Sequence, residues 1–526
     1  MEILAGLFVT ALYYARVIST FLVYVPNPPY SPDSWTYYEL SKTIFTNFYH
    51  INTFRQLQTT SPFGISFPPL FPILISVFNT LFNTSAYAGF LINFTLALCI
   101  PIIIYLFFRK NIFFASFVSL LLWSNKYFIE EVIAGRSIPL SIVLFITILV
   151  IALKGGKSYK TLILLGFLNG LMVLNRFDHL LAGVFFGLSY SYLVNRKSVV
   201  SVLRSVLIYF CSYIVFLSPW ILYSVFRFNS LFVSDNSRNL QYVTNIFVLD
   251  VVPKSEIQTL FNAPTEWIVA KLTNMVSFIY SLASELWSQY STRVSLILVI
   301  VFLVQCIKEV GRKMSEYIPI YFMLWGQFLT LALTGYDVRR YFVLIIFFIS
   351  YFVFVQLFKK RSIFFVVLIT VISYYLFTVS GDPFRWAVDR ISETNYVRPS
   401  TYVLENGEKF KALLTEFTKT KPARVLFDNT SGYDYVKFGA LTGTEVVFPP
   451  SNINSCNLVQ TIERFSATHI YSQCTYFLRS VSKYFSVKKS GLKGLYSVSP
   501  KGITKGDACS YEKDMNLVKC TQEDNL

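Results

Sequence analysis

One carboxylate stands out in the segment "SPDSWTYYEL" (31–40), which follows the first apolar stretch of the chain. Aspartate side chains are ionised at neutral pH, so Asp33 could accept a proton from a hydroxyl group as a general base. The alternative is that Asp33 caps a helix running through Trp35, Tyr38 and Leu40. The two roles are compatible, because a cap fixes the direction of the carboxylate.

Three arginines have the chemistry to hold a phosphate group. Arg176, Arg339 and Arg340 each follow or precede an apolar run, and a guanidinium group can bind two phosphate oxygens at once. The alternative is that they anchor the chain at a membrane interface or form ion pairs with Asp178 or Asp337.

Two further carboxylates are candidates for a second acid. These are Glu131, which follows Glu130, and Asp178 in "NRFDH". For Glu131 a solvated loop pair is the competing interpretation. Two carboxylates with a cation would suit a divalent metal, so a divalent metal stays an open alternative, although the spacing demands none and no residue is assigned as its ligand. Arg16 lies within an apolar run, where a charge usually faces a cavity or a partner.

The composition predicts a polytopic membrane protein. Of 526 residues 54% are hydrophobic and only 14% charged. The net charge of +17 does not predict binding to nucleic acid, because the Lys and Arg residues form small clusters between apolar runs. About eleven segments are long enough to span a bilayer. They lie near 3–25, 86–108, 112–128, 138–153, 161–175, 180–194, 200–226, 293–307, 317–334, 341–358 and 362–379.

The basic clusters fix the expected orientation. They follow alternate spans, which by the positive-inside rule places them in the cytoplasm. This alternation holds only if 65–83 does not cross the membrane, and its prolines favour a short helix at the outer interface. The outer side then receives a first loop (26–85), the segment 227–292 and the C-terminus, while 1–380 forms one transmembrane module.

Residues 395–526 have the pattern of a small α/β domain outside the cytoplasm. Strands are predicted in "ARVLFD", "TEVVFPP" and "THIYSQ", and helices in "GEKFKALLTEFTK", "LVQTIERFSA" and "YFLRSVSKYF", which favours partly parallel strands. No phosphate-binding glycine motif occurs. The four cysteines of this region favour disulfides over a zinc site, with three pairings open; they are Cys456, Cys474, Cys509 and Cys520.

Four segments resemble motifs of the GT-C glycosyltransferases, which include the protein O-mannosyltransferases, the lipid A aminoarabinose transferase and related bacterial polyprenyl-phosphate sugar transferases. They are the first loop with "SPDSWTYYEL" and "SFPPLFPIL", "GFLNGLMVLNRFDHLL" (166–181), "LSPWILYSVFRFNSLFVSD" (217–235) and "DVRRYFVLIIFF" (337–348). They occur in this order between residues 31 and 348 of the chain.

The resemblance implies a GT-C fold and transfer of a sugar from a polyprenyl-phosphate donor to a glycan, lipid or protein acceptor. It implies that Asp33 is the general base of an inverting single displacement, and it places the protein in a bacterial inner membrane with the site facing outward. The chemistry of the donor suits Arg176, Arg339 and Arg340 as partners of its phosphate. Two alternatives remain: a polymerase or ligase acting on lipid-linked polysaccharide, and a transporter of a lipid-linked substrate, for which Arg16 and Asp178 would line the path.

Overall fold

The computed structural model describes about half of the chain. Apart from a few isolated positions, the described residues are 2–25, 32–44, 54–56, 67–84, 87–107, 112–123, 126–195, 198–228, 263–288, 318–334, 424–427, 445–448, 466–472, 475–489 and 495–501.

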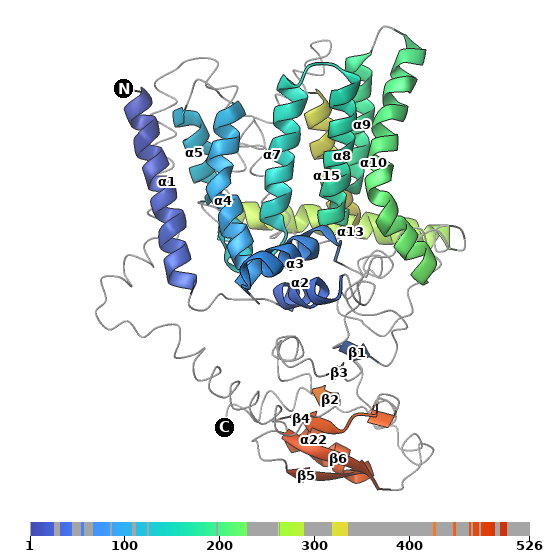
Figure 1. The fold of residues 1–526 in the computed structure, drawn as a ribbon. Coiled ribbons are helices and arrows are strands. Elements are labelled where there is room, and N and C mark those ends of the chain that lie inside the picture. Colours follow the sequence, from blue (N-terminus) through green and yellow to red (C-terminus); the bar gives the residue numbers. More distant parts are fainter. Residues whose placement is uncertain are drawn as a thin grey trace. The chain divides into compact units, whose positions relative to one another are not determined.

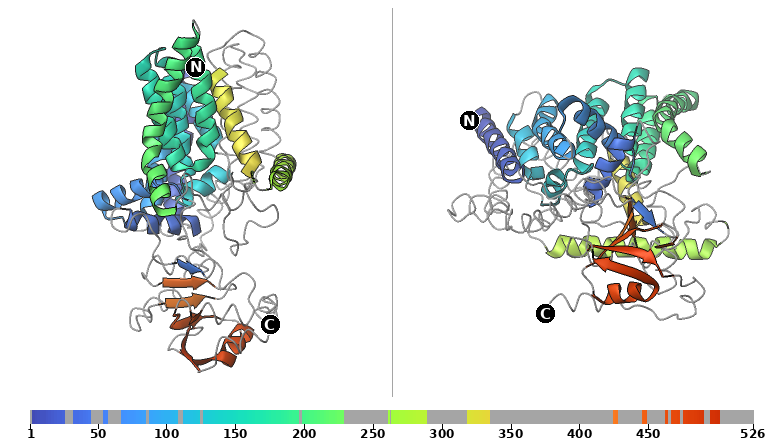
Figure 2. Two further views of the ribbon diagram at one scale, coloured as in Figure 1. Left: turned by 90° about the vertical axis from the view of Figure 1, so that its right-hand side faces the viewer. Right: turned by 60° about the horizontal axis from the view of Figure 1, so that its bottom comes forward.

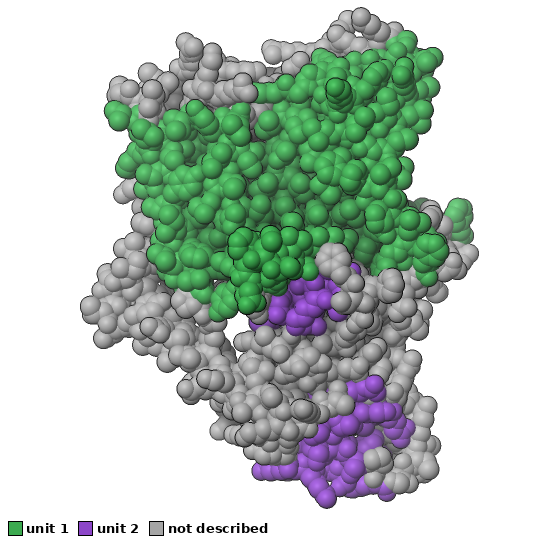
Figure 3. All heavy atoms as spheres, viewed as in Figure 1, with its two compact units in different colours: residues 1–30, 67–243, 255–396 green, residues 31–66, 244–254, 397–526 purple. Residues whose placement is uncertain are grey.

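The chain divides into two compact units, coloured separately in Figure 3. Unit 1 consists of residues 1–30, 67–243 and 255–396, and unit 2 of residues 31–66, 244–254 and 397–526. The sequence-based division groups residues 1–380 in one transmembrane module. In the structure, two segments of that range belong to unit 2: residues 31–66, which carry Asp33, and residues 244–254.

Unit 1 is a bundle of apolar helices (Figure 1). Four described helices are long and apolar enough to cross a membrane, which identifies an integral membrane protein. The predicted spans 293–307, 341–358 and 362–379 lie outside the described residues, so the count of eleven stays a prediction. The helices at predicted spans are α1 (Glu2–Tyr24), α4 (Ala88–Phe107), α5 (Ile112–Trp123), α7 (Ile138–Lys154), α8 (Tyr159–Asn175), α9 (Leu180–Val194), α10 (Val199–Phe228) and α15 (Ile318–Thr334).

One predicted span is shorter than expected. The sequence suggests a single span over 112–128, but α5 ends at Trp123 and a separate short helix, α6 (Lys126–Ile133), begins soon after it.

Small residues allow close packing between the helices. Gly183 and Gly187 of α9 lie directly against the rings of Tyr213 and Tyr209 of α10, so a Cβ atom at either glycine would collide with them. The Tyr209 hydroxyl also donates to the Gly183 carbonyl at 2.9 Å. In a bilayer, where burial of apolar surface gives little drive for association, such contacts and hydrogen bonds hold helices together.

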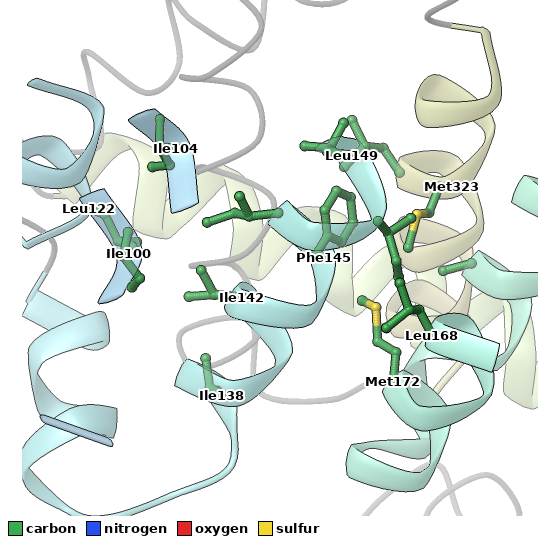
Figure 4. Packing of buried hydrophobic residues seen from close by; sticks show 14 of the residues in the cluster. Ile100, Ile104, Leu122, Ile138, Ile142, Phe145, Leu149, Leu168, Met172 and Met323 are labelled. Atoms are coloured by element: carbon green, nitrogen blue, oxygen red, sulfur yellow. The ribbon is translucent and has the colours of Figure 1, made fainter. Parts of the chain in front are cut away.

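A continuous apolar core joins the helices of unit 1. Figure 4 shows Phe145 of α7 on the side of Leu168 and Met172 of α8, with Met323 of α15 beside them, whereas Ile142 of α7 points to the side of Ile100 of α4. All six side chains are buried. This packing fixes the relative positions of α7, α8 and α15, which carry the polar groups of the site.

Two helices lie across the bundle instead of along it (Figures 1 and 2). The first is α3 (Leu70–Phe82), whose 13 residues are fewer than the roughly 20 that a span requires. That 65–83 does not cross the membrane stays a prediction. The second is α13 (Pro264–Ser288), which the sequence analysis missed. Its Ile268, Leu272 and Val276 lie exposed on one side, while Phe278 is buried on another.

Unit 2 contains a six-stranded mixed sheet in the order β1-β3-β2-β4-β6-β5. Strands β1, β3, β2 and β4 are parallel, whereas β4, β6 and β5 pair antiparallel. The predicted strands at β2, β3 and β4 and the helix at α22 are confirmed, and β1, β5 and β6 are additional. The bounds are β1 (Phe54–Gln56), β2 (Arg424–Phe427), β3 (Glu445–Phe448), β4 (His469–Tyr471), α22 (Thr475–Tyr484), β5 (Phe485–Lys489) and β6 (Leu495–Pro500).

The strand β1 ties the first loop to the C-terminal region. It comes from residues 54–56 and pairs in parallel with β3, with Phe54 opposite Val446. The core beneath the sheet is formed by Leu426, Val447, Ile470 and neighbouring apolar residues. The first loop is therefore part of the same unit as the C-terminal sheet.

Candidate active site

Asp33 lies in the first turn of α2 (Pro32–Thr43), a helix of unit 2. The helix begins at Pro32, whose fixed φ angle suits the first helical position. Asp33 is therefore inside the first turn and not at the capping position that the alternative interpretation gave it. A carboxylate in this turn is stabilised by the positive end of the helix dipole. Its side chain is half-buried.

A second carboxylate lies on the same helix. Glu39 is buried and accepts a hydrogen bond from Lys42 Nζ at 2.7 Å, and this ammonium group also lies 4.3 Å from the centre of the Tyr38 ring. Glu39 therefore has a local cationic partner one turn away. It provides a matched comparison for Asp33 on the same element.

The connection between α6 and α7 in unit 1 holds the first arginine–carboxylate pair. Arg136 Nη1 lies 2.5 Å from Glu131 Oε1, and the Glu131 side chain is only 2% exposed. Asn93 of α4 donates to the backbone carbonyls of both Glu131 (3.2 Å) and Arg136 (2.8 Å). Gly135, between them, has a φ of +68°, which glycine adopts without strain. The amide of Asn93 thus clamps a tight turn that the ion pair closes.

The turn between α8 and α9 holds the second pair. Arg176 Nε donates to Asp178 Oδ1 at 3.0 Å, and Gln327 Nε2 of α15 donates to Asp178 Oδ2, also at 3.0 Å. Both oxygens of the buried carboxylate therefore accept a hydrogen bond. The Arg176 side chain is 13% exposed and is therefore partly accessible.

His179 extends this arrangement into a chain of hydrogen bonds. Its Nδ1 lies 2.6 Å from Gln327 Oε1, and its Nε2 lies 3.0 Å from Ser141 Oγ of α7. Asn175 Nδ2 donates to the same Ser141 oxygen at 2.7 Å. Because Gln327 offers an acceptor, His179 donates through Nδ1 and accepts the Ser141 proton at Nε2. One neutral tautomer of His179 satisfies every bond.

The two turns are joined directly. Asn175 Nδ2 also donates to the backbone carbonyl of Ser137 at 2.9 Å, and these residues are the chain neighbours of Arg176 and Arg136. Bond lengths alone then keep the Cα atoms of the two arginines within about 17 Å of each other. The two arginines, each paired with its own carboxylate, therefore belong to neighbouring turns of unit 1. A guanidinium group oriented in this way can bind an anion.

The structure brings some predicted residues together and leaves others undetermined. Arg176 and Asp178 form a pair, and Arg16 is buried in α1, as expected for a charge inside a span. Arg339 and Arg340 lie outside the described residues, as do all four cysteines of the C-terminal region. Within the described part of the chain, no group of three His, Cys, Asp or Glu side chains is placed to hold a metal ion.

The sequence analysis missed Gln327, His179, Ser141 and the two asparagines that clamp the turns. Gln327 lies within the apolar run of α15 and is 3% exposed. A polar side chain inside a predicted span usually faces the interior of the bundle, and this signal was available in the sequence. Its partners were not, because they come from other helices.

Comparison with known proteins gives similarity in structure only. No protein-family model matches the sequence, and no curated protein matches it. The chain is similar to ArnT from Cupriavidus metallidurans bound to undecaprenyl phosphate, with a TM-score of 0.47 and 14% identity over 93% of this chain and 97% of that chain. For ArnT in the apo state the TM-score is 0.45 at 12% identity, with the same coverage. For the oligosaccharyltransferase AglB from Archaeoglobus fulgidus, in complex with an inhibitory peptide and a dolichol-phosphate, it is 0.43 at 14% identity over 94% and 74%.

With TM-scores below 0.5, these similarities carry no argument about its activity.

Proposed function

We propose that the protein is a membrane glycosyltransferase that moves one sugar from a polyprenyl-phosphate carrier to a glycan, lipid or protein acceptor outside the cytoplasm of a bacterium. The observation that carries this proposal is the Arg176–Asp178 pair, a partly exposed arginine fixed by a buried carboxylate. It lies in one of the four segments that resemble the motifs of the class. A fixed guanidinium group suits a phosphate that leaves with negative charge.

The proposed reaction is a single displacement. Asp33 takes the proton from the acceptor hydroxyl, whose oxygen attacks the anomeric carbon of the donor sugar. The bond between that carbon and the phosphate oxygen breaks, and the polyprenyl phosphate leaves with the electron pair. One base and cationic stabilisation of the leaving group are sufficient, because phosphate is already a good leaving group. The configuration at the anomeric carbon is inverted.

The two candidate second acids have a different proposed role. Glu131 is paired with Arg136, and Asp178 accepts hydrogen bonds from both Arg176 and Gln327. A carboxylate whose oxygens are occupied by donors is poorly placed to accept another proton. We therefore propose that Glu131 orients the Arg136 guanidinium group and that Asp178 orients the Arg176 guanidinium group. Arg339 and Arg340 stay candidates for further contacts with the phosphate, and no step of the reaction uses a metal.

The proposal is tested by the glycans of the host. Lipid-linked and surface glycans are profiled by mass spectrometry with the gene present, deleted and restored. We expect deletion to remove one sugar residue from a glycan or glycolipid and restoration to return it, and the mass difference names the sugar class. If deletion changes no glycan or glycolipid, the glycosyltransferase proposal is wrong and the transporter alternative takes its place.

A further inference from the structure

Gln327 uses both ends of its side-chain amide within the bundle. Its Nε2 donates to Asp178 Oδ2 at 3.0 Å, and its Oε1 lies 2.6 Å from His179 Nδ1. The residue is 3% exposed, and Asp178 and His179 are also buried. A single side chain of α15 therefore contacts two consecutive residues of the α8–α9 turn.

The backbone of α15 lies unusually close to this turn. A Cβ atom on Gly326 would lie 2.6 Å from the Leu181 carbonyl oxygen and 2.8 Å from Ala182 Cα, both in α9. Only glycine permits this approach without a shift of one helix. The close contact is what allows the adjacent Gln327 to reach Asp178.

The hydrogen-bond chain also fixes the direction of the Gln327 amide. Asn175 and Ser141 hold His179 with its Nδ1 proton directed at Gln327 Oε1. The amide nitrogen must then face Asp178. With one oxygen bound by Gln327, the plane of the Asp178 carboxylate is set, and so is the position of the oxygen that accepts from Arg176 Nε.

We propose that Gln327 is a positioning residue that sets the direction of the Arg176 guanidinium group toward the phosphate of the lipid-linked donor. This inference rests on the proposed function and adds a residue and an element to it. The helix α15 ends at Thr334, a few residues before Arg339 and Arg340 in the chain.

The chemistry of the position favours glutamine over its close analogues. A glutamate would place a second carboxylate against Asp178 and would lack the N–H donor. A methionine has similar length but would leave Asp178 Oδ2 and His179 Nδ1 without this partner, at a cost for each buried polar group. Glutamine alone of the three supplies a donor and an acceptor.

The test is a double-mutant cycle with undecaprenyl phosphate as the probe. The full-length protein is reconstituted in nanodiscs, and its affinity for the probe is measured for native protein, Gln327→Met, Arg176→Ala and the double variant. We expect Gln327→Met to weaken binding about tenfold in the native background and to have no further effect in the Arg176→Ala background. Gln327→Asn, which keeps an amide but has a shorter reach, is expected to weaken binding similarly and serves if the methionine variant does not fold.

Asn274→Leu provides the matched control. Asn274 of α13 is buried and donates to the Leu333 carbonyl of α15 at 3.2 Å, so its loss disturbs the same helix without touching Asp178. We expect native affinity in this variant.

The outcomes separate the two proposals. If Arg176→Ala binds the probe as well as native protein does, the role of Arg176 in the proposed function is wrong, and the positioning role falls with it. If Arg176→Ala weakens binding and Gln327→Met does not, only the positioning role is wrong. An equal loss from Gln327→Met in both backgrounds would also overturn it, because the effect would then not pass through Arg176.

Discussion

The α6–α7 and α8–α9 turns each hold one arginine and one buried carboxylate, but they are built differently. In the first turn the pair is local, and Asn93 fixes the backbone through the carbonyls of Glu131 and Arg136. In the second turn the carboxylate of Asp178 is shared between Arg176 and a distant helix. The first turn is stabilised through its main chain, and the second through side chains from several helices.

This difference indicates which pair is suited to function. The Glu131–Arg136 ion pair joins two residues of one turn, and Asn93 of α4 binds the backbone of that turn and not the side chains of the pair. The Asp178 carboxylate, in contrast, also accepts a hydrogen bond from Gln327 of α15. The direction of the Arg176 guanidinium group therefore depends on how the helices are packed. We therefore assign the donor phosphate to Arg176 and a chiefly structural role to the Glu131–Arg136 pair.

The largest expected effect comes from neutralising each pair in turn. Arg176→Gln with Asp178→Asn removes the guanidinium group without leaving a buried charge unpaired, and we expect sugar transfer to fall about 100- to 1,000-fold. Arg136→Gln with Glu131→Gln is the matched variant, and we expect transfer near the native level. The measurement is the rate at which the missing sugar reappears in the deletion strain. Equal losses in the two variants would remove the distinction between the turns.

A smaller effect is expected from the two asparagines that clamp the turns. Asn93→Leu leaves the carbonyls of Glu131 and Arg136 without this donor, and Asn175→Leu does the same to Ser137 O and Ser141 Oγ. Each should lower the free energy of unfolding by about 1–3 kcal/mol per acceptor left unpaired.

The affinity for undecaprenyl phosphate is expected to differ between Asn93→Leu and Asn175→Leu. We expect only Asn175→Leu to weaken binding of undecaprenyl phosphate, because only Asn175 holds the hydrogen-bond chain that leads to Arg176. Thermal unfolding in detergent and affinity in nanodiscs provide the two measurements. Weaker binding in Asn93→Leu alone would reverse the assignment of the turns.

The smallest effect is expected from two buried serines. Ser141→Ala removes the hydroxyl between Asn175 and His179 and should cost about 1 kcal/mol. Ser119→Ala should cost little, since its hydroxyl donates to the Ala115 carbonyl one turn earlier in its own helix. The difference in melting temperature between the two variants reports how much the Ser141 hydrogen bonds contribute to stability. Identical melting temperatures would indicate that they contribute nothing.

The sequence predicts the spans of unit 1 well because an apolar run has a local signal. Helices α8 and α9 lie almost where their apolar residues place them. The helix α13 was missed because polar residues interrupt its apolar positions, so no window of it reads as a span. The strand β1 was missed for another reason: its three residues gain their stability from pairing with β3, nearly 400 residues further along the chain.

The residues of the candidate site are likewise predictable from the sequence only where their contacts are local. Arg176 and Asp178 are two positions apart in the sequence, which makes an ion pair between them a prediction that a single sequence can supply. The role of Gln327 depends on Gly326, which brings α15 against α9, and on His179, which fixes the amide. Neither contact has a signature in a single sequence, since each depends on the packing of separate helices.

The most direct test of the central claim compares two carboxylates on the helix α2. The glycan mass profile of the deletion strain is recorded after restoration with native protein, Asp33→Asn or Glu39→Gln, with equal amounts of each protein verified in the membrane. If Asp33 is the general base, the Asp33→Asn profile will match the deletion and lack the same sugar residue, while Glu39→Gln will restore it. A native profile from Asp33→Asn would contradict the account, because sugar transfer would then proceed without its proposed base.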